Sequence, residues 1–278
     1  IDTDKMINML EKSINTIKNL KRWNGHLYNW YNIKTLEPLS PAFISTVDSG
    51  NFVGYLFVVR NVLEKENKEE LVNVVNEIIV NTDFSKLYDY DKSLFSIGYD
   101  FKENKLVDSY YDLLASESRQ ASFIAIAKRD ISYKHWFNLG RALTVVDGYK
   151  GLVSWSGTMF EYFMPNVIMP SYEYSLLEET YRFCLYSQKK YANKLGVPWG
   201  ISESAFSLQD LNYNYQYKAF GIPWLGLKRG LKEDVVVAPY ASLITINKNY
   251  KDVLRNMELL KDVGAYDKFG FYESIDYT

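Results

Sequence analysis

Two glutamates, Glu203 and Glu117, lie in segments whose composition is typical of functional sites. Glu203 is in the string VPWGISESA at residues 197–205, where proline, glycine and serine disfavour a helix or strand interior, and functional groups favour such loops. Glu117 is in the string SYYDLLASESR at residues 109–119, flanked by serines and preceded by tyrosines. Glycosidic bond cleavage needs one carboxyl group to protonate the leaving oxygen and another as nucleophile or base, and aromatic faces hold sugar rings. The pair therefore indicates chemistry on sugars.

Each glutamate also has a purely structural interpretation. Glu203 is in a Ser-Glu-Ser-Ala string that is good helix-entry sequence, so it could cap the next helix. Glu117 is in a helical pattern whose apolar neighbours face a core, so an ion pair with Arg119 or Arg141 is the competing role. Spacing alone leaves both interpretations open.

Two further carboxylates have the same ambiguity. Asp48, in the string VDSGN at residues 47–51, stands in a turn just before an apolar helix expected to begin near Phe52, where an N-cap or Asx-turn is the simpler role. Glu161 ends the string WSGTMFE at residues 155–161 and starts a helix, where the helix dipole favours a carboxylate in any protein. Glu161 could instead bind a sugar hydroxyl.

Composition excludes several other functions. The 32 basic and 34 acidic residues are interspersed and give a net charge of −2, so nucleic acid or an anionic membrane is not expected as the main partner. No apolar run of about 18 residues exists to span a bilayer. The 24 tyrosines suit a carbohydrate cleft but equally suit a thick helical core.

Metal, nucleophilic-serine and nucleotide chemistry also lack their motifs. His26 and His135 are far apart and Cys184 stands alone, so we expect no metal site and no cofactor. No Gly-x-Ser-x-Gly string is present, and neither Leu139-Gly-Arg nor Lys228-Arg-Gly follows a strand with phosphate-binding glycines. Cys184 lies on an apolar helical stretch, excludes an internal disulfide and is expected to be a buried packing residue.

The elements that must position the carboxylates are mainly helices. Apolar spacing predicts long helices over residues 3–20, 52–64, 68–81, 109–128 and 175–195. It predicts shorter ones over residues 134–141, 159–164, 210–217, 240–246 and 249–263, and short strands over residues 93–100 and 269–277. No linker divides the chain, so residues 1–278 are expected to form one domain. Helices joined by site-bearing loops are compatible with a toroid of paired helices or with another all-α array.

Many ordered strings resemble one family, the glycoamylase-like domain of bacterial cyclic β-1,2-glucan synthases, which is related to endo-β-1,2-glucanases. The strings begin at Gly25 and cover about nine tenths of the chain. They are GHLYNWY (25–31), TLEPL (35–39), STVDSGN (45–51), LFSIGY (94–99), SYYDLLASE (109–117), HWF (135–137), SWSGTMFEY (154–162), GVPWGISES (196–204), YQY (215–217), GLKRG (226–230), VAPY (237–240) and GFYESIDY (270–277).

The resemblance implies an all-α (α/α)6 toroid with minor strands and an active site in its central cleft. It implies retaining transglycosylation and cyclisation of β-1,2-glucan, with Glu117 as nucleophile and Glu203 as acid/base through a substrate hydroxyl. An inverting endo-β-1,2-glucanase and a catalytically silent glucan-binding module are the alternatives. Substrate contacts are expected from Asp48, Trp155, Glu161, Trp199, Tyr28, Trp30, Arg229 and Tyr240.

The chain also departs from the synthases it resembles. It starts without Met and ends at Thr278, where the synthases continue towards further modules, so we expect a domain excised from a larger protein. A helix that closes the toroid could lie beyond that residue. The resemblance implies β-1,2-glucan and the other synthase modules as partners. It places the domain on the cytoplasmic side of a membrane-bound parent, with a secreted or periplasmic location as the alternative.

Overall fold

The computed structural model describes residues 2–278, which fall into two compact units. Unit 1 contains the chain up to Asp112 together with Ser118–Leu139, and unit 2 contains Leu113–Glu117 and Gly140–Thr278. The chain thus enters unit 2 briefly at Glu117 before it completes unit 1. The prediction that residues 1–278 make one domain stays a prediction.

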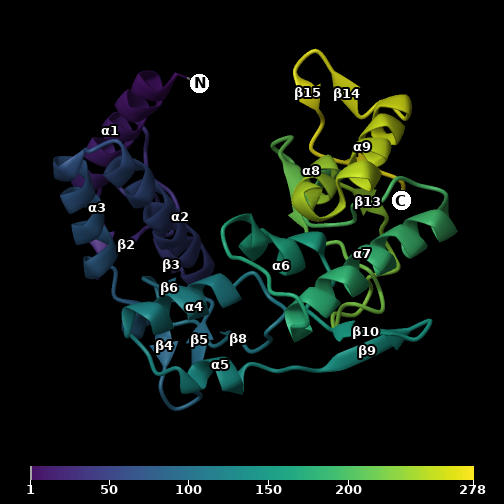
Figure 1. Ribbon diagram of the computed structural model, residues 1–278, viewed down its shortest axis with the longest axis horizontal. Coiled ribbons are helices and arrows are strands. Elements are labelled where there is room, and N and C mark those ends of the chain that lie inside the picture. The colour runs from purple at the N-terminus through teal and green to yellow at the C-terminus, as the bar shows by residue number, and fades with distance from the viewer. Residues whose placement is uncertain (1) are drawn as a thin grey trace. The chain divides into compact units, whose positions relative to one another are not determined.

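Unit 1 is built on helices packed around an aliphatic core. Its helices are α1 (Thr3–Asn19), α2 (Thr46–Lys65), α3 (Glu69–Asn81), α4 (Arg119–Lys128) and α5 (Lys134–Asn138). Helix α1 buries Ile7 and Ile14, two turns apart on one face, and α1, α2 and α3 are seen beside one another in Figure 1. Helix α2 packs on α4 so closely that a Cβ added at Gly50 would lie 2.4 Å from the Cβ of Ala121.

Short antiparallel sheets complete unit 1. They pair β1 (Arg22–Trp23) with β2 (His26–Leu27), β6 (Gly98–Asp100) with β3 (Phe43–Ser45) and β7 (Lys105–Leu106), and β5 (Leu94–Ser96) with β4 (Tyr88–Asp89) and β8 (Tyr110–Tyr111). Because β8 pairs with β5 through Tyr111 and Phe95, the backbone at Tyr110–Tyr111 is extended, and bends lead from there to Glu117.

Unit 2 places four helices among hairpins. The helices are α6 (Met159–Phe163), α7 (Leu176–Leu195), α8 (Pro239–Leu243) and α9 (Ile246–Asp262). Helix α7 begins where the Ser175 side chain accepts the Glu178 N–H and ends at Gly196, whose φ of +71° suits a residue without a Cβ. Cys184 is completely buried on this helix, which confirms the predicted packing role.

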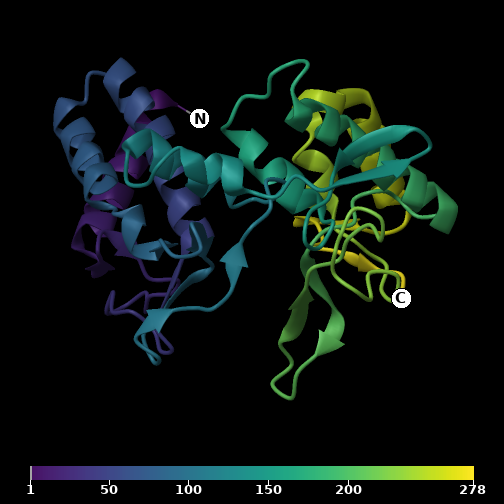
Figure 2. The same cartoon turned by 90° about the horizontal axis from the view of Figure 1, so that it is seen from below.

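The strands of unit 2 all pair antiparallel. They are β9 (Leu143–Val146) with β10 (Tyr149–Leu152), β11 (Ser204–Gln209) with β12 (Tyr215–Lys218), β13 (Val236–Val237) with β16 (Ile275–Asp276), and β14 (Tyr266–Asp267) with β15 (Gly270–Phe271). The hairpin of β11 and β12, green in Figure 2, projects from the body of unit 2. It begins one residue after Glu203.

Most predicted helices are present. One of them is shorter than predicted, and another is absent. Residues 109–118 are strand and loop, with the helix starting only at Arg119, because the aromatic pair at the start of this segment joins a sheet. Residues 210–217 are a turn followed by β12 rather than a helix, since Asp210 accepts the backbone N–H groups of Asn212 and Asn214 and thereby closes the turn.

The helix-rich character agrees with the predicted class, and the finer prediction of a toroid belongs with the functional proposal. Among residues 2–278 there are nine α-helices, and the strands are short. Helices α2 and α7 are the longest at 20 residues each. No helix within this described part of the chain combines the length and hydropathy needed to cross a bilayer.

Candidate active site

Two buried amide side chains hold the loop that carries Glu203. The Gln188 side chain of α7 donates to the carbonyl of Ile201 at 2.8 Å and accepts its N–H at 2.9 Å. The Asn256 side chain of α9 donates to the carbonyl of Trp199 at 2.7 Å and accepts its N–H at 3.0 Å. Both amides are fully buried, where an unpaired polar group costs about 1–3 kcal/mol. The backbone is therefore fixed two and four residues before Glu203.

Hydrogen bonds of the Tyr240 and Ser202 side chains also hold this loop. The Tyr240 hydroxyl lies 2.8 Å from the carbonyl oxygen of Glu203 and 2.9 Å from Ser202 Oγ. Ser202 Oγ also accepts the N–H of Phe160, at the start of α6, at 3.1 Å. Gly200 has a φ of +133°, and a Cβ there would approach the carbonyl oxygen of Ala238 at 3.1 Å. Gly200 and Ser202 of the string thus help to fix the conformation of this loop.

The carboxylate of Glu161 is enclosed by donors from its own loop. Ser154 Oγ donates to it at 2.6 Å, and the N–H groups of Ser156 and Thr158 donate at 3.0 and 3.1 Å. The Glu161 N–H in turn donates to Thr158 Oγ1, completing a capping box at the start of α6. Burial raises the pKa of Glu161, while these hydrogen bonds act in the opposite direction.

The Glu117 carboxyl is buried and is affected by the charges of Glu161 and Glu203. Burial raises the pKa of the Glu117 carboxyl to about 8, and the charges of Glu161 and then Glu203 add to this effect. An arginine ion pair would lower that pKa instead. The structural interpretation of Glu117 as half of an ion pair with Arg119 or Arg141 is therefore not supported.

Glu203 is the third member of the group. Burial raises the pKa of Glu203 to about 7, the charge of Glu161 contributes, and a hydrogen bond from the Tyr217 hydroxyl opposes the rise. Burial and the Glu203 carboxylate likewise raise the pKa of Tyr217, and burial, opposed by the Ser202 hydrogen bond, raises that of Tyr240. Since Glu203 leads into strand β11, the alternative in which it caps a helix is wrong.

Two of these carboxyl groups, Glu117 and Glu203, can bind and release protons near neutral pH. Interacting sites titrate as a set, so the shifted pKa values belong to the group of Glu117, Glu161 and Glu203 together. General acid–base catalysis is most efficient when the pKa lies near the working pH. All three residues belong to unit 2, and together they form the candidate active site.

The other predicted contact residues of unit 2 differ in accessibility. Trp155 is 60% exposed and offers its ring to a ligand, whereas Trp199 is only 7% exposed. The Trp199 ring is packed in the core of unit 2 and presents little surface, and its substrate contact stays a prediction. Tyr240 is partly buried and fixes the loop through its hydroxyl, while Arg229 is exposed in a loop after β12.

Three predicted contact residues belong to unit 1. Asp48 lies inside the first turn of α2, and its N–H donates to Ser45 Oγ at 3.1 Å, so Ser45 rather than Asp48 is the N-cap. Tyr28 packs its ring against Phe101, with ring centroids 5.1 Å apart, and Trp30 is exposed. Their contacts with a substrate stay predictions.

Sequence reasoning missed two site residues, Tyr217 and Glu273. Tyr217 lowers the pKa of Glu203, and the charge of Glu273 reaches both Tyr217 and Tyr240. Both residues stand in strings of the family resemblance, at residues 215–217 and 270–277, which was the available signal. The spacing of 14 and 70 residues from Glu203 hid their proximity.

The chain has a helix-rich fold that groups three buried carboxyl groups, and comparison with known proteins identifies its family. The Glycoamylase family model, described as putative glucoamylase, matches residues 109–278. The chain therefore belongs to the putative glucoamylase family. The matched segment contains Glu117, Glu161 and Glu203.

Individual relatives agree with this assignment. The chain is 29% identical over 405 aligned positions to the cyclic beta-(1,2)-glucan synthase NdvB of Rhizobium meliloti, covering 100% of this chain and 14% of that protein. A putative glucoamylase structure from Bacteroides caccae matches with a TM-score of 0.80 at 14% identity, covering 100% of this chain and 72% of the other. An endo-beta-1,2-glucanase from Chitinophaga pinensis, in complex with sophorotriose and glucose, matches with a TM-score of 0.76 at 15% identity, covering 100% and 71%. At these identities the structural matches establish the fold.

We predict that Gln188→Leu destabilises the protein by about 1–3 kcal/mol. Leucine fills similar space but leaves the Ile201 N–H without its partner and the Ile201 carbonyl with only the 3.4 Å bond from the Met159 N–H. Urea unfolding measures the change. Asn193→Leu, at an exposed position of the same helix, is the control and should stay within about 0.5 kcal/mol of the parent. Equal stability of both variants would mean that Gln188 does not secure the loop.

We also predict that Glu117→Gln stabilises the protein at pH 8 but not near pH 4.5. The folded state keeps a proton that the unfolded chain releases above pH 4.5, so the free energy of unfolding falls as pH rises from 4.5 to about 8. An amide removes this dependence, and the gain should reach the order of a few kcal/mol. Melting curves across this pH range, with Glu258→Gln on the exposed face of α9 as control, provide the measurement. A gain that shrinks towards pH 8 would contradict the raised pKa.

Proposed function

We propose that this chain acts on β-1,2-glucan as a retaining transglycosylase that transfers or cyclises the chain. The observation that carries the proposal is the grouping of Glu117 and Glu203 in one site, each with its pKa raised towards neutrality. The names of two relatives, a cyclic β-1,2-glucan synthase and an endo-β-1,2-glucanase, support the substrate class. The exposed ring of Trp155 and the hydroxyl of Tyr217 offer contacts to sugar rings and hydroxyls.

In the proposed reaction, bond making and proton transfer are divided between the two glutamates. The Glu117 carboxylate attacks the anomeric carbon, the glycosidic C–O bond breaks, and the leaving oxygen receives a proton that originates on Glu203, relayed through a substrate hydroxyl. A glucan hydroxyl then attacks the glycosyl ester, returns its proton to Glu203 by the same route and frees Glu117. Water in place of the glucan hydroxyl gives slow hydrolysis.

Glu161 would act on the other two carboxyl groups rather than on the sugar. It is held by its own loop, and its charge favours protonation of both Glu117 and Glu203. This replaces the expectation, from the resemblance, that Glu161 contacts substrate.

The proton affinities bear on which glutamate is the nucleophile. A pKa of about 7 keeps Glu203 protonated often enough near neutral pH to act as an acid. The pKa of about 8 at Glu117 in the free site favours the proton-donor role for that residue as well, whereas a nucleophile must be ionised. The two values are close and belong to one coupled set, so the assignment of Glu117 as nucleophile rests on the family resemblance.

The wider setting follows from the same relatives. We propose that the helices of both units belong to an (α/α)6 toroid, and that the chain functions within a larger membrane-bound synthase on its cytoplasmic side. The chain spans 14% of NdvB, so further modules are the partners this proposal implies. A glucan-binding module without activity would use the same exposed aromatic rings. It would retard in a β-1,2-glucan affinity gel but release no products.

Incubation with linear β-1,2-glucan tests the reaction. We expect cyclic or redistributed glucans with slow release of shorter oligomers, and the first-formed anomer observed by proton NMR should retain the β configuration. Cleavage of other β-glucans with no change to β-1,2-glucan would reject the substrate. An inverted first product would remove Glu117 as nucleophile, indicate an endo-β-1,2-glucanase and shift the base role towards Asp48.

We predict that Glu203→Gln and Glu117→Gln each lower turnover by about 10²- to 10⁴-fold or more, while circular dichroism stays unchanged and glucan is still bound. Gln is nearly isosteric with Glu but cannot transfer a proton or attack carbon. Azide added to Glu117→Ala and Glu203→Ala decides the roles: the nucleophile variant should yield the glycosyl azide of inverted configuration and the acid/base variant the retained one. Glu258→Gln is the control. Near-normal turnover per folded molecule in either Gln variant would exclude that residue from catalysis.

A further inference from the structure

A groove opens along unit 2 immediately beyond Glu203. Its volume is about 420 Å³, within the range of small-ligand sites. It is formed by the start of the β11–β12 hairpin and by the chain at β16, and its lining includes Ala205, Ser207, Tyr215, Tyr272, Glu273 and Asp276. Nothing in the proposed chemistry uses these side chains.

The groove adjoins the backbone that follows Glu203. Ala205 lies two residues after Glu203, and its N–H donates to Glu273 Oε1 at 2.9 Å. The charge of Glu273 in turn reaches the hydroxyls of Tyr217 and Tyr240. Tyr240 donates to the backbone carbonyl of Glu203, and Tyr217 lowers the pKa of the Glu203 carboxyl. The groove therefore begins two residues from the carboxyl group that the proposed reaction uses.

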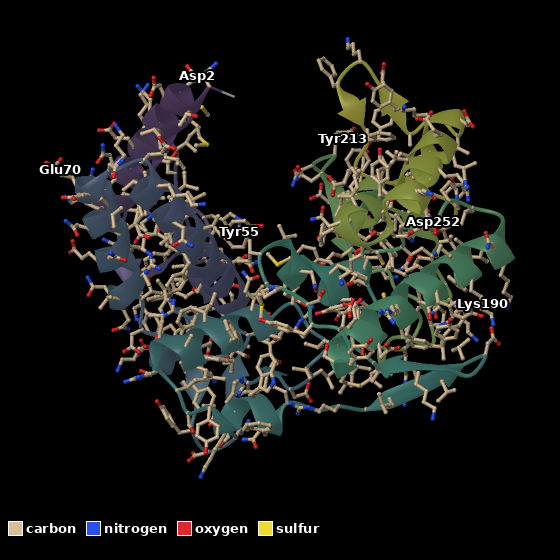
Figure 3. All side chains as sticks on the ribbon, viewed as in Figure 1. Asp2, Tyr55, Glu70, Lys190, Tyr213 and Asp252 are labelled. Carbon is tan, nitrogen blue, oxygen red and sulfur yellow. The ribbon has the colours of Figure 1, made fainter. Side chains whose placement is uncertain are left out.

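Strand β12 links the two places with aromatic rings. Side chains two residues apart on a strand lie on the same face, so Tyr215 and Tyr217 are neighbours on β12. Tyr217 contacts Glu203, while Tyr215 lines the groove opposite the residues at β16. Tyr215 is 64% exposed and Tyr272 is 53% exposed. Tyr213, labelled in Figure 3, is a further exposed tyrosine in the turn that precedes β12.

The polar lining is acidic and held in place. Asp276 accepts hydrogen bonds from the N–H of Ser207 at 3.2 Å and from the N–H of Thr278 at 2.9 Å, and Glu273 is held by Ala205. Carboxylate oxygens can accept more than one hydrogen bond, so both groups can also receive sugar hydroxyls. Two carboxylates in one groove disfavour an anionic ligand, whereas open tyrosine rings beside them suit a neutral carbohydrate.

We propose that this groove is an outer sugar-binding site, in which Tyr215 and Tyr272 stack on glucose units that lie beyond those held at Glu203. The inference rests on the proposed function, since it takes β-1,2-glucan as the ligand. It assigns the hairpin a role in selecting chain length: short oligosaccharides reach only the carboxyl groups, and longer ones gain the groove.

The test measures affinity against chain length in the complete protein. Calorimetry with β-1,2-gluco-oligosaccharides from two to about ten units is carried out in the Glu203→Gln background, so that the ligand is not consumed. Tyr215→Ala and Tyr272→Ala should each weaken binding of the long oligosaccharides about three- to tenfold and leave the disaccharide unchanged. Tyr215→Phe should keep the affinity, because the ring face is retained. Tyr250→Ala, at an exposed tyrosine on α9, is the matched control.

Each outcome has a distinct meaning. Unchanged affinity at every length in both Ala variants overturns the outer site while leaving the proposed function intact. An equal loss at every length also overturns it, because that pattern reports damage at Glu203; melting curves of the variants show whether the fold is affected. If the parent binds β-1,2-glucan of no length, the proposed function fails and the groove's assignment fails with it.

Discussion

The constraint on which the site depends is the burial of three carboxyl groups, to which the charge of Glu161 adds at Glu117 and Glu203. Glu117, Glu161 and Glu203 each have a raised pKa, and burial is the first cause in every case. Burial removes water that would stabilise a carboxylate, and neighbouring negative charge adds to this cost. Folding therefore keeps protons in a place where the unfolded chain would release them. Burial of these carboxyl groups lowers the free energy of unfolding at neutral pH. The same burial raises their pKa values, which favours proton transfer.

The surrounding structure offsets that cost in different ways for the three groups. Glu161 receives donors from Ser154, Ser156 and Thr158, so its charge is stabilised locally by the start of α6. The Tyr217 hydroxyl lowers the pKa of Glu203. The loop that carries Glu203 is held by hydrogen bonds from Gln188 and Asn256. Long helices α7 and α9 thus contribute to the site through one buried amide each. These two helices hold the backbone of the loop that carries the Glu203 carboxyl group.

The short strands of unit 2 position residues next to Glu203 and in the adjoining groove. Strand β11 follows Glu203 directly, and its partner β12 returns with Tyr217 to the same carboxyl group. Strand β16 returns the end of the chain to β13 and carries Asp276 into the adjoining groove. A helix-rich fold therefore uses hairpins where aromatic and acidic side chains must converge, since alternation along a strand sends every second side chain to one face.

The sequence by itself predicted most of the long helices and singled out Glu117 and Glu203 as candidate site residues. Apolar periodicity identifies α1, α3 and α7 closely, because each packs a single face, and Pro, Gly and Ser around Glu203 specify a loop. It could not decide the local structure before Glu117 or after Asp210, where pairing with distant strands and turn hydrogen bonds overrides the apparent pattern. Only the tertiary structure showed that the Trp199 ring is buried, that Glu161 is fixed by its own loop, that Tyr217 acts on Glu203, and that Glu273 acts on Tyr217. The physical reason is that burial and charge coupling depend on distances through space, and residues 14 to 86 positions apart have no local signal of proximity.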